Sequence, residues 1–162
     1  MQNDSFPYSL NQIPEIEISY KPFYNPLERR TITDSFKSYT LFKLIWDKKQ
    51  LSYKEHCVVA YMNNAREVIG ICRHSIGSDI ACTLSIKQIL AAWLKANAKY
   101  LILAHNHTWG NTNPSNADIQ LTWNLKYACQ VVWLKLVDHI IVNESEWYFS
   151  MSDEWYVENW YS

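Results

Sequence analysis

Hydrophobic and polar positions follow two different periods along the chain, and these predict strands and helices in turn. Stretches with the period of a strand, or with a short apolar run of strand character, cover residues 15–20, 55–62, 67–72, 100–105, 131–142 and 147–150. Stretches with apolar residues on one side of a helix cover residues 33–46, 85–97 and 115–129. Because strands alternate with helices and a hairpin lies at each end, the pattern predicts a three-layer α/β domain with a mixed β-sheet flanked by helices.

The predicted helices begin at residues that can cap a helix N-terminus. The side chains that can accept a hydrogen bond from the first backbone N–H groups are those of Thr33 or Asp34, Ser85 and Ser115. Gln88 and Asp118 each stand three residues after one of these serines, which is the spacing of a capping box. Asn97 is the expected end of the middle helix.

Length and composition favour one domain with one substantial core. The chain has 162 residues, and 48% of them are hydrophobic, as in globular proteins. Residues 1–14 are polar, contain proline and are expected to form a flexible N-terminal arm. The domain is expected over residues 15–154, followed by an aromatic C-terminal tail over 155–162.

Charge and cysteine content argue against several classes of protein. The 15 basic and 16 acidic residues give a formal net charge of −1, which argues against a nucleic-acid partner because such proteins usually carry a basic excess. The cysteines form no CxxC pair and are expected to be free in a reducing compartment. No secretory signal or membrane-spanning run is visible, so the default expectation is a cytoplasmic protein. The oligomeric state stays open.

The stretch from Leu101 to Asp118 carries the candidate chemistry. His105 and His107 are two residues apart at the end of a predicted strand, so their imidazoles project from the same face. Asp118 follows in the first turn of the next predicted helix and can approach them. Two imidazole nitrogens and one carboxylate form a three-ligand set for a divalent metal with an open fourth position, which is typical of catalytic zinc.

A metal-activated hydrolase also needs a carboxylate that takes a proton from the attacking water. Glu55 is the candidate, because it begins the first strand of the predicted hairpin and lies at an edge where it can reach a site. The sequence pattern alone leaves other glutamates open for this role, among them Glu15, Glu17, Glu28 and Glu67.

The spacing His105-x-His107-x7-Ser115-x2-Asp118 resembles the JAMM motif of the JAB/MPN metalloprotease fold. The surrounding words LILAHNH, IQLT, LVDHIIV and YFSMSDE look like the RadC branch of that family, over about residues 31–154. The resemblance implies a cytidine-deaminase-like, three-layer domain. One departure is the pair Thr108-Trp109, where RadC-like chains usually have Pro-Ser, and the bulky indole is expected to affect the substrate groove.

The same resemblance implies roles for the site residues. His105, His107 and Asp118 would bind one Zn²⁺, and Glu55 would act as general acid/base. Ser115 would donate a hydrogen bond to the developing oxyanion. The implied reaction is hydrolysis of a peptide or isopeptide bond in a peptide or protein substrate, in which metal-activated water attacks the carbonyl.

Two other functions stay open at this point. A non-catalytic MPN-like interaction module typically lacks the metal ligands, which this chain retains. A RadC-type role in DNA metabolism is suggested by the family name but opposed by the neutral charge. The His-x-Glu and Pro-Cys-x-x-Cys pattern of zinc deaminases is absent. His139 is expected to be a buried histidine near the site rather than a ligand.

Overall fold

The computed structural model describes residues 28–46, 49, 51–75, 85–108, 111–145 and 147–158. The predicted arm at 1–14 and the predicted strand at 15–20 lie outside the described residues, as do Cys82 and Trp109. The division of the chain into arm, domain and tail therefore stays a prediction.

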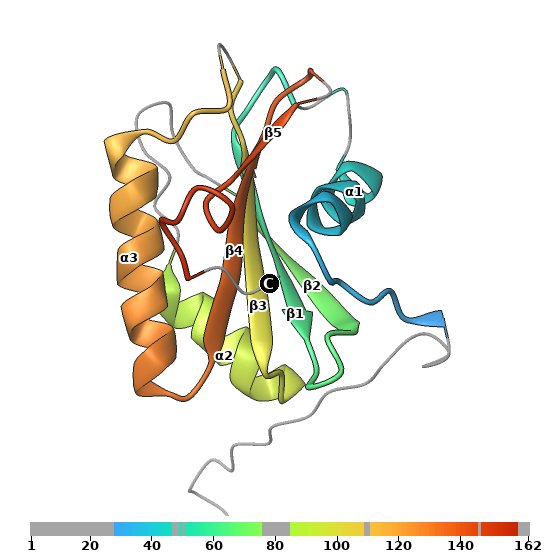
Figure 1. The fold of residues 1–162 in the computed structure, drawn as a ribbon, viewed down its shortest axis with the longest axis vertical. Coiled ribbons are helices and arrows are strands. Elements are labelled where there is room, and N and C mark those ends of the chain that lie inside the picture. The colour runs from blue at the N-terminus through green and yellow to red at the C-terminus, as the bar shows by residue number, and fades with distance from the viewer. Residues whose placement is uncertain are drawn as a thin grey trace, which may run out of the picture.

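Helices and strands alternate in the order that the hydrophobic pattern predicts (Figure 1). The elements are α1 (Ser35–Ile45), β1 (His56–Met62), β2 (Val68–Ser75), α2 (Ile86–Ala96), β3 (Tyr100–Asn106), α3 (Asn116–Val131), β4 (Lys135–Val142) and β5 (Tyr148–Ser150). The strands form one five-stranded sheet in the order β2-β1-β3-β4-β5. Only the β3–β4 pair is parallel, with α3 as its crossover, so the sheet is mixed as predicted.

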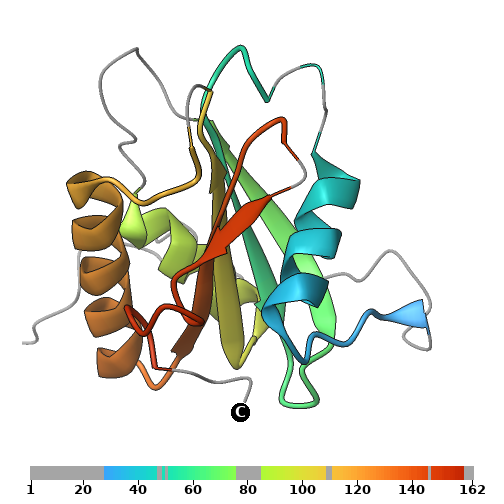
Figure 2. The ribbon, with the colours of Figure 1, turned by 45° about the horizontal axis from the view of Figure 1, so that its top comes forward.

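The sheet is covered on both faces, with α1 on one side and α2 and α3 on the other (Figure 2). The sheet has a hydrophobic core on each face, and successive residues of β1 and β3 point into opposite cores. Val58 and Ile102 pack with α1, whereas Val59 and Leu103 pack with α2 and α3. Burial on both faces explains why β3 and β4 read as continuous apolar runs rather than as alternating patterns. His105 has the same parity as Leu103, so it faces α3.

The predicted helix caps are confirmed. Asp34 accepts a hydrogen bond from the Lys37 backbone N–H at 2.7 Å, which selects Asp34 over Thr33. Ser85 caps α2, and Asn97 ends it in the left-handed conformation with φ of 49°. At the start of α3 the reciprocal capping box between Ser115 and Asp118 is complete.

Two strand boundaries differ from the prediction by three residues or more. β2 continues to Ser75, beyond the predicted end at residue 72. β4 begins at Lys135, whereas a strand was predicted from residue 131. Val131 still belongs to α3, and a turn follows in which the Leu134 N–H donates to the Cys129 carbonyl at 2.9 Å. An apolar run that spans a helix end, a turn and a strand has no periodicity that separates them.

Substitutions on the buried and exposed faces of α2 are expected to change the free energy of unfolding by different amounts. Ile89 is fully buried against the sheet, whereas Leu94 on the same helix is 58% exposed. We expect Ile89→Ala to lower the free energy of unfolding by about 2–5 kcal/mol, because it removes buried methyl groups and leaves a cavity. Leu94→Ala is the matched control and should change it by less than about 0.5 kcal/mol. Urea unfolding of the metal-free protein measures both, and equal costs would contradict the packing described here.

Candidate metal centre

His105, His107 and Asp118 converge where β3 ends and α3 begins. The Nε2 atom of His105 lies 3.2 Å from Oδ1 of Asp118, and Nε2 of His107 lies 3.3 Å from Oδ2. One candidate ligand atom from each of the three residues lies within 4.8 Å of the others. His105 and Asp118 are buried, and His107 is half-buried. The structure thus brings together the three predicted ligands.

The capping box at the start of α3 orients the Asp118 carboxylate. Both the backbone N–H and the hydroxyl of Ser115 donate to Oδ2 of Asp118, at 2.8 and 2.6 Å. Oδ1 is left facing His105. In this arrangement the Ser115 hydroxyl proton is directed at Asp118, so in this structure Ser115 orients the carboxylate. Its predicted role at the oxyanion stays a prediction.

The electrostatics of the cluster favour a bound cation. Burial opposes ionisation of Asp118, but the nearby imidazole nitrogens of His105 and His107 hold the pKa of this carboxyl well below its usual value. The hydrogen bond to Asp118 raises the pKa of His107. The carboxylate is therefore ionised and holds positive charge at the neighbouring imidazole, where a divalent cation would replace a proton.

Hydrogen bonding leaves the Nε2 atom of both histidines facing the centre. Nδ1 of His107 lies 3.0 Å from the Asn111 carbonyl oxygen, which can only accept, so Nδ1 carries a proton. In neutral His107 the lone pair is then on Nε2. This fixes which ring nitrogen of His107 can bind a metal.

The orientation of His105 comes from a buried chain of hydrogen bonds. The Thr122 hydroxyl donates to the Asp118 backbone carbonyl at 2.6 Å, so its oxygen accepts from Nδ1 of His139, also at 2.6 Å. With its proton on Nδ1, neutral His139 accepts at Nε2 from Nδ1 of His105, at 2.7 Å. Burial holds the pKa of His139 well below its usual value, which keeps it neutral. The Thr122 hydroxyl also lies 3.1 Å from Sδ of Met151, a weaker acceptor than the carbonyl.

The hydrogen bonds from Thr122 through His139 to His105 leave one polar atom at the candidate metal centre without a hydrogen bond. Nε2 of His105 is buried, carries a lone pair in the neutral ring and makes no hydrogen bond among the described residues; its polar contact is with Oδ1 of Asp118, at 3.2 Å. A buried polar atom without a partner is costly, and metal coordination would satisfy it. The donor set of two imidazoles and one carboxylate, with a further position free, fits Zn²⁺.

His139 and Thr122 therefore position the metal ligands. The predicted burial of His139 near the site is confirmed, since it is fully buried and contacts His105. Thr122 has no counterpart in the sequence reasoning. Its position four residues after Asp118 on the same helix is the only signal that placed it near the site.

Glu55 lies beside the centre, outside the three-ligand group. It directly precedes β1 and is half-buried. Cys57↔His105 is the last pair of the antiparallel β1–β3 ladder, so Glu55, before β1, and His107, after β3, lie at the same end of the sheet. Its charge also contributes to the raised pKa of His107, after the hydrogen bond to Asp118.

Asn106 holds the segment that carries Glu55, and sequence reasoning missed it. This fully buried residue stands between the two histidines. Its Oδ1 accepts from the His56 backbone N–H at 2.6 Å, and its Nδ2 donates to the carbonyls of Leu51 and Lys54 at 2.7 and 2.9 Å. A polar residue at an apolar strand end was the available signal, since a buried amide must find partners.

Removing the Thr122 hydroxyl is expected to weaken metal binding without unfolding the protein. Thr122→Val keeps the side-chain shape but leaves Nδ1 of His139 without its acceptor. The affinity for Zn²⁺, measured by competition with a chromogenic chelator, should fall by roughly 10–100-fold. Thr40→Val is the matched control, because Thr40 makes the same bond to a helix carbonyl four residues back but lies on α1. Unchanged affinity in Thr122→Val would contradict the positioning role.

Comparison with known proteins agrees with this geometry. The chain matches the family model described as the RadC-like JAB domain over residues 32–156. It is 33% identical to a UPF0758 protein of Flavobacterium johnsoniae over 128 residues, which cover 79% of this chain and 54% of that protein. It is 35% identical to a UPF0758 protein of Haemophilus ducreyi over 118 residues, covering 72% and 52%. The chain thus spans about half the length of these curated relatives.

The described helices include none that is both long enough and apolar enough to span a membrane. The five-stranded mixed sheet, the helices on both of its faces and the cluster at the end of β3 agree with the fold that the motif implies. The family match covers most of the chain, from the first described core residue to the segment after β5. The chain belongs to the RadC-like JAB domain family.

Proposed function

We propose that this chain is a zinc-dependent hydrolase of the JAMM type that cleaves peptide or isopeptide bonds. The observation that carries the proposal is the buried Nε2 atom of His105. It has no hydrogen-bond partner in the described residues and lies 3.2 Å from the Asp118 carboxylate. A site built only for stability would pair this atom, whereas a metal site leaves it free.

The roles of the residues follow from their positions. His105, His107 and Asp118 would hold one Zn²⁺, which when bound lowers the pKa of a coordinated water and polarises a carbonyl. Glu55, at the same end of the β1–β3 pair as His107, would take the proton of the attacking water and pass it to the leaving amine. Asn106 keeps the backbone before β1 in place and so fixes the distance between Glu55 and the ligands.

The Ser115 hydroxyl would contribute in a second orientation. It now donates to Oδ2 of Asp118. Rotation about the Cα–Cβ bond of Ser115 would direct the same hydroxyl proton at a developing oxyanion. The Ser115 backbone N–H keeps the carboxylate in place during this change.

The competing functions have less support. A non-catalytic interaction module would not need oriented metal ligands or the series of hydrogen bonds that links Thr122, His139 and His105. A role on DNA lacks electrostatic support, because the formal net charge is −1. The relatives are named UPF0758 proteins, a name that states no activity.

Glu55→Gln separates metal binding from catalysis. We expect the variant to bind Zn²⁺ as the unchanged chain does, because Glu55 is not one of the three ligands. Hydrolysis should fall by roughly 100-fold or more, because the amide cannot accept a proton. The assay incubates the zinc-loaded protein with a tryptic peptide mixture and with isopeptide-linked lysine peptides, and new termini are counted by mass spectrometry.

Controls define how this experiment fails. Glu154→Gln, at an exposed position after β5, should leave both zinc content and hydrolysis unchanged. Asp118→Ala should remove zinc and hydrolysis together. Wild-type protein that binds no zinc, or a Glu55→Gln variant that hydrolyses as fast as the wild type, would overturn the proposal. Cleavage of oligonucleotides with no cleavage of peptides would favour the nucleic-acid alternative.

A further inference from the structure

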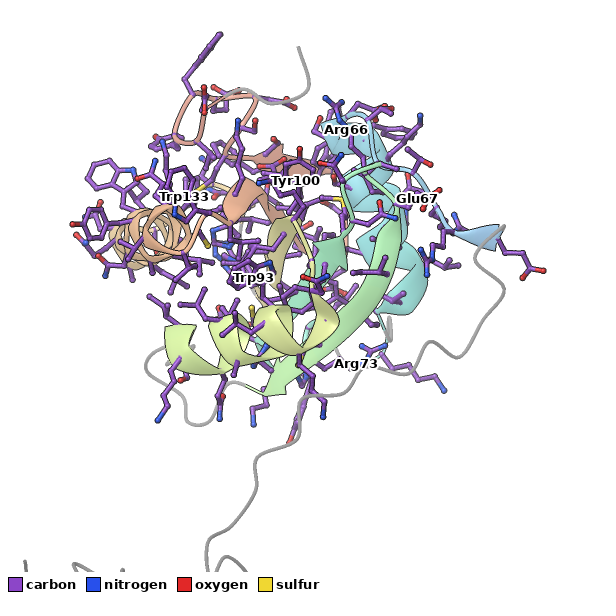
Figure 3. The ribbon with its side chains drawn as sticks, turned by 90° about the horizontal axis from the view of Figure 1, so that it is seen from below. Arg66, Glu67, Arg73, Trp93, Tyr100 and Trp133 are labelled. Atoms are coloured by element: carbon purple, nitrogen blue, oxygen red, sulfur yellow. The ribbon has the colours of Figure 1, made fainter. Side chains whose placement is uncertain are left out.

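A hollow lies at the opposite end of the sheet from the candidate metal centre. It has a volume of about 390 Å³ and is bordered by the first residues of β3 and β4, the last turns of α3 and the segment after β5. Figure 3 shows the molecule from this end, with Tyr100 and Trp133 labelled. Because β3 runs from Tyr100 to the histidines, the strand rise separates the hollow from the metal centre by roughly 20 Å.

Three lysines gather around this hollow although the chain as a whole carries a net charge of −1. Lys135 pairs with Glu158 at 3.2 Å. Lys99 and Lys126 have no acidic partner among the described residues. Together with Glu158, the lysines leave an excess of two positive charges at the cavity. Like charges gathered at one concave site repel each other, and an anion would relieve that repulsion.

Trp133 occupies a backbone position that normally belongs to glycine. Its φ is 60°, in the left-handed region, directly after α3. The Trp133 N–H donates to the Gln130 carbonyl and the Leu134 N–H to the Cys129 carbonyl, which is the Schellman pattern of a helix end. Any residue other than glycine costs free energy there. The side chain recovers none of it by burial, since Trp133 is 86% exposed.

Trp133 lines the hollow together with the lysines, where its indole can contact a bound ligand. Trp155 is also in the left-handed region and 78% exposed, but it does not line the hollow. Strain and exposure are therefore not sufficient signs of a binding role. What distinguishes Trp133 is its place at the rim of a cavity with excess positive charge. A flat ring stacks on an indole face, and a phosphate pairs with lysine ammonium groups.

We propose that the hollow formed by Lys99, Lys126, Trp133 and Lys135 binds a phosphate monoester attached to a planar ring. The phosphate carries a charge of about −1.5 to −2 near pH 7, which matches the excess of positive charge at the cavity. The ring stacks on Trp133, and Gln130 on the last turns of α3 lies within the same lining to donate a hydrogen bond. The volume is in the range of small-ligand pockets. This site is independent of the proposed hydrolase function.

The experiment uses the full chain with AMP, phenyl phosphate, inorganic phosphate and adenosine as separate probes. Calorimetry measures affinity, and the indole N–H signals of the 8 tryptophans in an NMR spectrum report the position. We expect AMP or phenyl phosphate to bind, the tighter of them identifying the nucleotide or the phosphorylated ring as the natural source. Both should bind more tightly than phosphate or adenosine, and the Trp133 signal should shift.

Matched variants locate the binding. Trp133→Gly should weaken AMP binding by roughly five- to a hundredfold and leave phosphate binding unchanged. Trp155→Gly relieves the same backbone conformation outside the hollow and should change neither. Lys99→Gln with Lys126→Gln should weaken AMP and phosphate alike, whereas Lys87→Gln on the exposed surface of α2 should not. Thermal melting and zinc content check that each variant is folded.

Several results would overturn the proposal. Failure of both ring phosphates to bind at millimolar concentration would do so, as would binding that the hollow variants leave unchanged. Adenosine binding as tightly as AMP would remove the role of the lysines. AMP binding no tighter than phosphate, with Trp133→Gly neutral, would remove the role of the indole.

Discussion

The hydrogen bond between Nδ1 of His105 and Nε2 of His139 is the interaction on which the metal centre depends. It lies in the buried layer between the sheet and α3, where an unpaired nitrogen is costly. Because Thr122 fixes the proton on His139, the bond can run in only one direction in the neutral form. Because Nδ1 of neutral His105 donates to His139, its lone pair is on Nε2, which faces Asp118. A metal-binding geometry thus follows from the requirement that buried polar groups be satisfied.

One β-α-β unit supplies almost all of this arrangement. β3 carries His105, His107 directly follows β3, α3 carries Asp118 and Thr122, and the parallel neighbour β4 carries His139, which is paired in register with Leu103. Parallel pairing brings β3 and β4 side by side only after the chain has passed through α3. The helix is therefore held over the same strands that present the imidazoles. Glu55 directly precedes β1, which lies on the opposite side of β3 from β4. The Asn106 side chain holds the backbone there by accepting a hydrogen bond from the His56 N–H.

The two ends of the sheet have different chemistry. The end after β3 gathers imidazoles and a carboxylate whose pKa is held low by them. The end before β3 and β4 gathers lysines around a hollow next to an exposed indole. The strands between them are buried on both faces and packed into two cores, so the sites are separated by rigid structure. Each can be altered by mutation without disturbing the other.

The sequence by itself determined the element types and the candidate ligand set. Caps at Asp34, Ser85 and Ser115 are local devices that act within a few residues, so spacing alone located the helix starts. The HxH pair and Asp118 were likewise found from a strand period and a helix start. The limits of β4 were not, because an apolar run carries no mark of where a helix ends and a strand begins.

Only the tertiary structure decided the partners that lie far apart along the chain. His139 is 34 residues from His105, and the Asn106 amide reaches backbone groups 50 to 55 residues away. The gathering of Lys99, Lys126 and Lys135 at one hollow also has no periodic signal. Such contacts depend on strand order and register, which arise from the packing of the whole domain. Local sequence patterns fix direction and spacing within an element, whereas the sheet decides which elements meet.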